Sequence, residues 1–284
     1  MDRLLLLISF VFLVNVHAVA EDKDVLTRFF RILPESQSHT FYGSARDRYF
    51  KPDSIKVFVW NIKKGLEANW EPEFKKFAEN RDLILLQEAY RTQLFNNTTA
   101  SFDGIRWDMG IGFLYRMYNN QATGTMIGSN VDPTEVIVKH SVDDEPVTGT
   151  PKSITFAKYP IEGQQDELLV ISVHGINLTS HATFVRHMNQ AQAVIDQHTG
   201  PILFAGDFNT RTQMRTKYLM NMIQKNGFKT VTFKNGHLRM RFKFTKNYLD
   251  HAFVRGLSVS NAEVIGQAYG SDHKPLFLEM SVDQ

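Results

Sequence analysis

The sequence predicts an α/β fold in which two mixed sheets pack face to face and helices cover them from outside. Short apolar runs recur along the chain, and most of them end in a polar residue. Helix-like segments lie mainly in two places, and hairpin-like strands fill the rest. The chain lacks the strict strand–helix alternation of a doubly wound sheet, so mixed sheets with external helices are the better interpretation.

The composition is that of a globular protein with a large core. The 284 residues suit one large domain or two small ones, and 43% of them are hydrophobic. Charged residues make up 22%, which excludes a disordered chain and a coiled coil. The sequence has no cysteine, so disulfides, thiolate metal sites and a cysteine nucleophile are excluded.

The N-terminus resembles a secretory signal. Arg3 precedes a run over 4–14 that is apolar except for Ser9, and Ala18-Val19-Ala20 supplies small residues at the spacing that a signal peptidase reads. We expect a signal peptide over 1–20, cleaved after Ala20, and an exported protein that is periplasmic or secreted. The run is shorter than the roughly 20 apolar residues of a membrane-spanning helix. An uncleaved anchor is the alternative.

The expected domain begins after a lead-in segment. Residues 21–54 form this lead-in, whose helical spacing ends at Pro34 and whose stretch 36–48 is predicted to be irregular. Residues 55–284 form the main domain, in which strands and helices follow one another.

Helices are predicted over 71–79, about 180–197 and 213–225. Proline is tolerated near the start of the first, and Ser180 or the residue before it is a candidate N-cap for the second. The strands are predicted over 55–60, 83–87, 123–127, 135–139, 153–158, 168–173, 202–205, 228–233, 239–245, 249–254 and 276–280.

Acidic residues lie at or near the ends of several of these strands. They are Glu88, Asp207, Asp250 and Asp272. A buried, unpaired carboxylate is costly, so such acids persist where a cation, an arginine or a histidine shares the site. Oxygen-rich sites suit Mg²⁺ or Mn²⁺ better than Zn²⁺. Six polar strand ends that meet in one cleft would hold a hard cation and a phosphate, whereas each acid alone would more often cap a loop or pair with a surface lysine.

The pair Asp272-His273 precedes Lys-Pro and places an imidazole beside a fixed turn. A neutral histidine takes a proton from water only when another acceptor sets its tautomer. Asp250 is the candidate for that acceptor. The alternative is a surface turn with a solvated histidine.

Neutral polar residues complete the candidate site. Asp207 and Asn209 are two apart and point the same way in extended backbone, so that one holds a water and the other a phosphate oxygen. His174 ends its strand and is placed to donate to a phosphate oxygen, although a lone buried histidine is more often only a satisfied polar group. Asn177 is a weaker candidate for the same rim. Asn61 offers an amide that orients a carboxylate or a metal-bound water.

A basic segment lies between the acids at 207 and 250. Residues 210–249 contain ten Lys and Arg but no Asp or Glu. On a strand over 239–245, Arg239, Arg241 and Lys243 would share one face and bind a phosphate backbone. The alternative is an edge strand that basic residues protect from aggregation. Nucleic acid fits such a ridge, and an anionic lipid headgroup fits nearly as well.

The ordered motifs Trp-Asn-Ile, Leu-Gln-Glu, Val-His-Gly, Gly-Asp-Phe-Asn, Leu-Asp-His and Ser-Asp-His-Lys-Pro resemble the endonuclease/exonuclease/phosphatase (DNase I-like) superfamily. The resemblance covers roughly 55–282 and is greatest to an uncharacterised bacterial branch. It implies a four-layer α/β sandwich and Mg²⁺-dependent phosphoester hydrolysis. The DNA-penetrating loops of abasic-site enzymes have no clear equivalent, so their substrate does not carry over.

The same resemblance implies a role for each site residue. The metal group comprises Asn61, Glu88 and Asp272. The catalytic group comprises His174, Asp207, Asn209, Asp250 and His273. In this group Asp207 aligns or deprotonates the attacking water and Asp250 orients His273; which of Asp207 and His273 is the base stays open.

Three functions remain in competition at this point. We favour a secreted or periplasmic nuclease that cleaves phosphodiesters of DNA or RNA by in-line attack of water. A phosphatase or phospholipase C/sphingomyelinase-like enzyme on a lipid or small phosphoester is the alternative, and an exposed aromatic hairpin over 113–118 would favour it. A non-catalytic binding protein is the third. We expect a monomer with Mg²⁺ or Mn²⁺ as cofactor.

Overall fold

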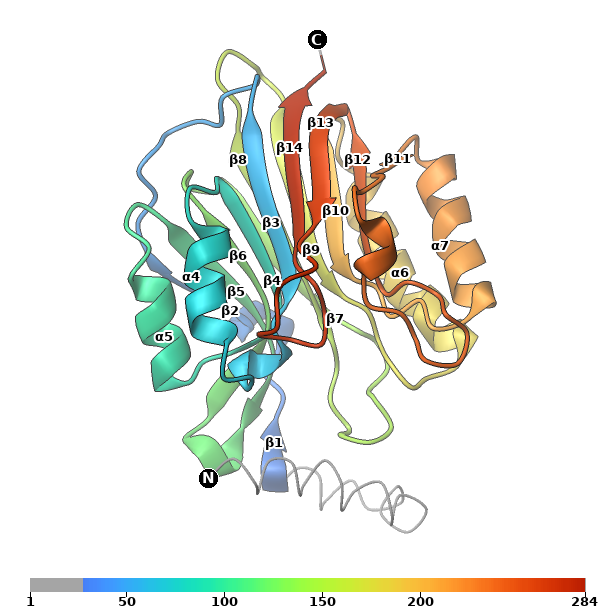
Figure 1. Ribbon diagram of the computed structural model, residues 1–284. Coiled ribbons are helices and arrows are strands. Elements are labelled where there is room, and N and C mark those ends of the chain that lie inside the picture. The colour runs from blue at the N-terminus through green and yellow to red at the C-terminus, as the bar shows by residue number, and fades with distance from the viewer. Residues whose placement is uncertain (1–27, 284) are drawn as a thin grey trace.

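The computed structural model describes residues 28–283. The predicted signal peptide over 1–20 and the start of the lead-in lie outside these residues. Two mixed sheets pack against each other, with α4 and α5 covering one and α6 and α7 covering the other (Figure 1). The predicted four-layer α/β sandwich is therefore confirmed. Within residues 28–283, no helix combines the length and the apolar character needed to cross a membrane.

The larger sheet has eight strands, and β3 lies near its middle. Its order is β1 (Phe30–Arg31), β5 (Arg106–Tyr115), β6 (Gln121–Ser129), β4 (Leu83–Tyr90), β3 (Ile55–Asn61), β14 (Leu276–Val282) and β13 (Leu257–Val264), with β2 (His39–Gly43) also paired to β5. Among the described strands, β3 and β4 run parallel and the other neighbours antiparallel.

The smaller sheet has six strands and carries its own parallel pair. Its order is β11 (Lys229–Thr230), β12 (Asp250–Arg255), β10 (Ile202–Asp207), β9 (Glu167–His174), β8 (Ser153–Pro160) and β7 (Glu135–His140). Strands β9 and β10 are parallel, and the remaining pairs described are antiparallel. The carboxyl ends of the two parallel pairs supply much of the candidate site.

Four α-helices are present in the described part of the chain. They are α4 (Trp70–Ala78), α5 (Gln93–Ala100), α6 (His181–Ile195) and α7 (Gln213–Lys225). Ser180 caps α6, as predicted, because its side chain accepts the backbone N–H of Thr183. Short 3-10 turns lie at Glu35–Gln37, Lys63–Gly65, Arg116–Tyr118 and Gly236–Leu238.

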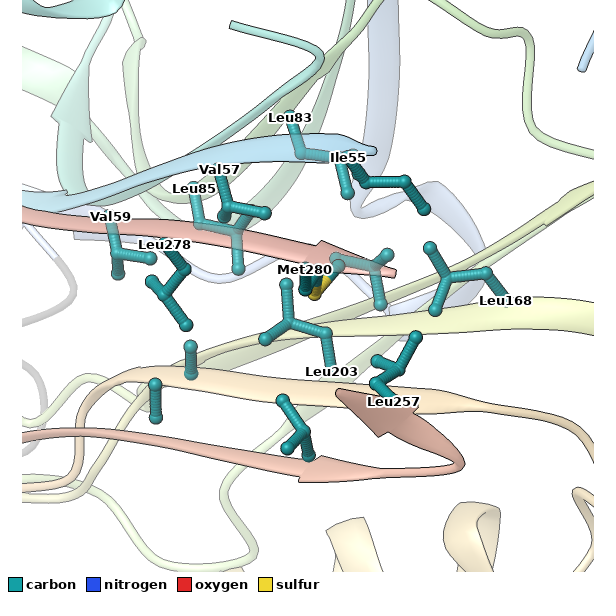
Figure 2. Packing of buried hydrophobic residues seen from close by; sticks show 14 of the residues in the cluster. Ile55, Val57, Val59, Leu83, Leu85, Leu168, Leu203, Leu257, Leu278 and Met280 are labelled. Carbon is teal, nitrogen blue, oxygen red and sulfur yellow. The ribbon is translucent and has the colours of Figure 1, made fainter. Parts of the chain in front are cut away.

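The central core lies between the two sheets (Figure 2). Val57 and Leu85 of the larger sheet face Leu168 and Leu203 of the smaller one. Alternate residues of β3, such as Phe58, point outward and pack under the helices. Both faces of β3 are thus buried, which explains its uninterrupted apolar sequence. Burial of each such side chain contributes about 1.5–3 kcal/mol.

The predicted strand over 239–245 is wrong. This stretch is a loop whose pairing is one isolated bridge between Arg241 and Tyr248. Alternating charge and apolarity imitates a strand, but the arginines here stack on Tyr248 and fold the loop onto itself. The strand predicted over 228–233 shrinks to β11.

The lead-in is more ordered than predicted. Residues 36–48 were expected to be irregular, yet they contain β2, which pairs with β5 at the edge of the larger sheet. Helix α5 was not predicted from the sequence. It is a polar helix, and its N-cap is Thr92, whose side chain accepts the N–H of Phe95.

Candidate functional site

The register of the smaller sheet aligns three polar residues. Asp207 ends β10 and pairs with His174 of β9 on one side and with Asp250 of β12 on the other. Neighbouring strands lie about 4.8 Å apart, so the three side chains form a row at one sheet edge. Gly206 permits this arrangement, because its φ is 141° and a Cβ there would lie 2.2 Å from the carbonyl oxygen of Val173.

The larger sheet delivers two more polar groups to the same place. Asn61 ends β3 and pairs with Gln87 of β4. The register of β4 then shifts, and Glu88 adopts a left-handed φ of 54°. Such a bulge redirects a side chain, and it does so here for the carboxylate of Glu88. Behind the site, Gln87 Nε2 donates to Ser172 Oγ at 3.2 Å and joins the two sheets.

The carboxylate of Asp207 is the centre of the site. Its Oδ1 accepts the backbone N–H of Asn209 at 2.9 Å, and its Oδ2 accepts from Asn61 Nδ2 at 3.1 Å. The same Oδ2 lies 3.7 Å from His174 Nε2 and 3.8 Å from His273 Nε2. Two amides and two imidazoles therefore surround one buried carboxylate.

His273 forms a pair with Asp250. Its Nδ1 lies 2.8 and 2.9 Å from the two carboxylate oxygens, so Nδ1 carries the proton and Nε2 faces Asp207. The indole of Trp60 donates to the carbonyl oxygen of His273 at 3.0 Å. This arrangement keeps a proton on Nδ1 and fixes the position of the ring.

The electrostatics of the site separate its groups. Burial raises the pKa of Asp207 to about 6, although the charge of His273 opposes this. Burial alone would lower the pKa of His273, but the neighbouring carboxylates of Asp250 and Asp207 raise it. Burial holds the pKa of His174 well below its usual value. At neutral pH, His273 is thus protonated and His174 neutral.

Glu88 is suited to hold a metal ion. Burial would raise its pKa, but the positive charges around it, of which Lys64 contributes most, together outweigh this and the pKa falls to about 2. Its side chain is 26% exposed, and its nearest polar neighbour, Asn61 Nδ2, lies 3.5 Å away. Within residues 28–283, the one donor to Asn61 Oδ1 is the backbone N–H of Lys63, which leaves a lone pair. An ionised carboxylate beside an amide oxygen fits Mg²⁺ or Mn²⁺.

A second arrangement of possible ligands lies deeper. Among the described residues, Asp207, Asp250 and His273 have ligand atoms within 4.8 Å of one another. Both oxygens of Asp250 already accept from His273, so this group would lose its internal hydrogen bonds on binding an ion. Glu88 with Asn61 is therefore the better metal position.

Two predicted residues lie at the rim. The Asp272 side chain is exposed and accepts from Ser271 Oγ at 3.3 Å, apart from the buried row. The backbone N–H of Asn177 donates to Glu145 at 2.9 Å, and its side-chain oxygen accepts from Leu178. Neither side chain hydrogen-bonds to the central carboxylate.

The three basic residues predicted to share one strand face do not do so. Arg239 lies 4.0 Å over the ring of Tyr248 and donates to the carbonyl oxygen of Asp250 at 3.2 Å. Arg241 also stacks on Tyr248 and donates to its hydroxyl. Lys243 is exposed. Arg239 thus supports the site from behind, whereas Lys243 is available to a ligand.

Sequence reasoning missed two positioning residues. The Glu73 carboxylate on α4 accepts the backbone N–H groups of Tyr269 and Gly270, at 2.7 and 2.6 Å, in the loop that carries His273. Arg215 is buried and donates to the carbonyl oxygen of Asn209 at 3.1 Å. Neither has a local signal, because each looks like an ordinary charged residue of a surface helix.

Comparison with known proteins agrees with this geometry. A model of the endonuclease/exonuclease/phosphatase family matches residues 58–273. A relative from Vibrio campbellii, described as a UPF0294 protein, is 32% identical over 240 residues, which cover 82% of this chain and 79% of that protein.

Two solved structures share the fold. An endonuclease/exonuclease/phosphatase from Beutenbergia cavernae has a TM-score of 0.61 at 15% identity and covers 81% of this chain and 72% of its own. The endonuclease domain of TRAS1, a telomere-specific non-LTR retrotransposon, has a TM-score of 0.54 at 13% identity and covers 81% of this chain and 100% of its own. The matched family model, the curated relative and the shared fold together show that the chain belongs to the endonuclease/exonuclease/phosphatase family.

Proposed function

We propose that this protein is a metal-dependent hydrolase that cleaves phosphodiesters by in-line attack of water. Membership of the family supports a phosphoester hydrolase. The main support for attack by water on a phosphodiester is the convergence of His174 Nε2 and His273 Nε2 on Asp207 Oδ2, at 3.7 and 3.8 Å. A water and a phosphoryl oxygen placed there would meet a base and two imidazoles together.

The proposed division of labour follows from the protonation states. Asp207 takes the proton from water, because its pKa lies near the working pH and its carboxylate is held by Asn61 and Asn209. His273 carries a proton on Nδ1 toward Asp250 and offers positive charge to a phosphoryl oxygen. His174 is neutral and donates a hydrogen bond. A divalent ion held by Glu88 would neutralise further charge on the phosphate.

Chelation tests the metal requirement. EDTA should abolish hydrolysis, and Mg²⁺ or Mn²⁺ should restore it. Hydrolysis that is indifferent to the chelator would overturn the metal-dependent mechanism.

The loop over 239–247 supports nucleic acid as the substrate. Phe244 is 81% exposed at its tip, between the exposed residues Lys243 and Lys246. The loop adjoins the site, since Thr245 Oγ1 donates to the carbonyl oxygen of Arg211 and Arg211 Nε donates to Asn209 at 3.3 Å. In such an arrangement the cations bind a phosphate backbone, and the exposed ring stacks on a base. We therefore favour a nuclease.

A lipid-directed phosphodiesterase is the second candidate. The hairpin over 113–118 is present as the end of β5 and the 3-10 turn that leads to β6, but Phe113 and Tyr115 pack edge-on against Phe30. Its exposed apolar side chain is Met117, at 60%. Met117 and Phe244 would enter a bilayer surface together only if they face it from the same side.

A parallel assay separates the candidates. The mature protein is tested on plasmid DNA, RNA, sphingomyelin and phosphoinositides. Lys243→Gln should weaken DNA binding and reduce its salt slope by about 1. Lys229→Gln is the matched control, because this lysine lies on β11 beside Asp283. If the protein cleaved the lipids but neither DNA nor RNA, the nuclease proposal would be wrong and the lipid-directed phosphodiesterase would replace it.

We also propose that the protein is exported, on the basis of the N-terminal pattern over 1–20. N-terminal sequencing of the protein recovered from cell fractions should begin at Glu21. An intact Met1 in the cytoplasmic fraction alone would overturn this proposal.

A further inference from the structure

A small pocket adjoins the site, and the mechanism above does not use it. It has a volume of about 110 Å³, and Glu88 and His174 form the boundary that it shares with the candidate site. The charged residues that line its remainder are Lys64, Lys152 and Glu145. Pockets for ligands of drug size measure roughly 300–1,000 Å³, so this one suits a compact group.

The charges of the pocket are only partly paired. Lys152 Nζ lies 3.3 Å from Glu145 Oε2, and this lysine is 18% exposed. Glu145 is committed further, because its Oε1 accepts the backbone N–H of Asn177 at 2.9 Å. An ammonium group has three donors, so Lys152 keeps unused donors toward the pocket.

The second lysine belongs to the opposite wall. Lys64 Nζ lies 3.9 Å from Glu88 Oε2, beyond hydrogen-bonding distance, and its hydrogen-bond partner is the neutral hydroxyl of Tyr115. Glu88 is also the carboxylate assigned to the divalent ion. When the charge of Glu88 is neutralised by that ion, the positive charges of Lys64 and Lys152 exceed the negative charge of Glu145, and the net charge of the pocket is positive.

Neutral donors complete the lining. The hydroxyls of Thr148 and Thr150 lie 2.7 Å apart in the loop that enters β8. The loop is closed on itself, since Gly149 N–H donates to the carbonyl oxygen of Glu145 at 2.8 Å. Hydroxyl and ammonium groups around a small volume are suitable hydrogen-bond donors to the oxygens of a phosphate.

We propose that this pocket binds a second phosphate group of the substrate, one that is not attacked. The inference rests on the proposed phosphodiesterase function. It predicts a substrate that carries a second phosphate, on a chain end or a headgroup, within reach of this pocket when the scissile bond lies at Asp207. The competing explanation is that each lysine only neutralises its glutamate.

Pairs of substrates that differ by one phosphate test the proposal. One oligonucleotide sequence is offered with a 5′-phosphate, a 3′-phosphate or hydroxyls at both ends. Phosphatidylinositol vesicles, with and without a 4-phosphate, form the lipid arm. The additional phosphate should raise kcat/KM about 10-fold in one arm, and that arm identifies the source of the phosphate.

Variants of Lys152 decide between the two explanations. Lys152→Gln should lose the phosphate preference, and Lys152→Arg should keep most of it. Lys158→Gln is the matched control, since Lys158 lies on β8 and pairs with Glu135 at 2.7 Å. If Lys152→Gln lowered kcat/KM equally for both members of a pair, the lysine would be only a neutralising partner and the proposal would fail.

A binding measurement keeps the pocket separate from the catalytic proposal. Inorganic phosphate should raise the Tm of the wild type and of Lys158→Gln more than that of Lys152→Gln. This difference, if seen without hydrolysis of any substrate, would support the pocket while the phosphodiesterase proposal fails. Equal shifts in all three proteins would overturn the pocket.

Discussion

At the edge of the smaller sheet, Asp207 and Asp250 are buried and their oxygens accept hydrogen bonds from the protein. At the facing edge of the larger sheet, Glu88 is 26% exposed and has Asn61 Nδ2, at 3.5 Å, as its nearest donor. Both edges supply carboxylates to one site, but only the first holds them tightly.

The difference originates in the backbone. Asp207 lies in regular register between two strands, so its position follows from the ladder itself. Glu88 lies at a register shift with a left-handed φ, which costs on the order of 1–3 kcal/mol. A strained, partly exposed carboxylate suits a ligand that must enter and leave. A carboxylate such as that of Asp207, whose oxygens are held by hydrogen bonds, suits a proton transfer that needs a fixed position.

The largest expected effect concerns the edge of the smaller sheet that carries Asp207 and Asp250, here called the locked edge. Asp207→Asn removes the proposed base while keeping the shape of the side chain, so kcat should fall about 10³-fold or more. Steady-state kinetics measure the loss, and circular dichroism checks that the fold is retained. Near-normal turnover in this variant would refute the catalytic role of Asp207.

The next effect concerns the edge of the larger sheet that carries Asn61 and Glu88, here called the exposed edge. Glu88→Gln removes the charge that faces the metal, so the Mg²⁺ concentration for half-maximal activity should rise on the order of 100-fold. Maximal activity at saturating Mg²⁺ should fall less than in Asp207→Asn. Glu67→Gln is the control, since Glu67 pairs with Lys63 at 2.6 Å on the surface. An unchanged Mg²⁺ titration would exclude Glu88 as a ligand.

The sequence predicted the regular parts of this comparison. Apolar runs such as that of β3 identify buried strands, and polar residues at the ends of β9 and β10 point to a common edge. Parallel strands bring their ends together by geometry alone, so Asp207 and His174 were predictable partners. The order of strands and helices indicated two sheets packed face to face with helices outside, and the resemblance identified this arrangement as a four-layer sandwich.

Other features depend on contacts that no local pattern records. Glu73 meets the backbone of Tyr269 and Gly270, far along the chain. The basic loop was predicted as a strand because alternation cannot reveal that Arg239 and Arg241 stack on Tyr248. The bulge at Glu88 likewise follows from pairing with β6, which one strand alone does not specify.

Acid should weaken the locked edge before the exposed one. His187 on α6 is buried behind β9, where its Nδ1 accepts the N–H of Ile176 at 3.1 Å. Burial lowers its pKa to about 3, against about 6.5 in the unfolded chain. Below pH 6.5 the unfolded state therefore binds more protons. Stability should decrease as the pH falls from 6.5 toward 3, by about 2 kcal/mol between pH 7 and pH 5.

Urea unfolding at pH 7 and pH 5 measures this loss. His187→Gln should reduce the pH dependence, since the titrating group is removed. Hydrogen exchange at pH 5 should show earlier opening of β9 and β10 than of β3 and β4. An unchanged pH dependence in His187→Gln would exclude this histidine as the cause.

The smallest effect concerns the loop between the two edges. Glu73→Ala removes the acceptor for two N–H groups of the loop that carries His273, so this ring should shift relative to Asp207. Because small displacements weaken catalysis, kcat should fall about 10-fold with little change in the Mg²⁺ titration. Glu71→Ala is the control, as Glu71 pairs with Lys75 on the same helix.

Glu73→Gln sharpens this last test, because its amide oxygen still accepts a hydrogen bond and should restore part of kcat. A purely structural role would lower Tm and the yield of folded protein but leave kcat per folded molecule unchanged. Such a result would mean that Trp60 and Ser271 position His273 without help from α4.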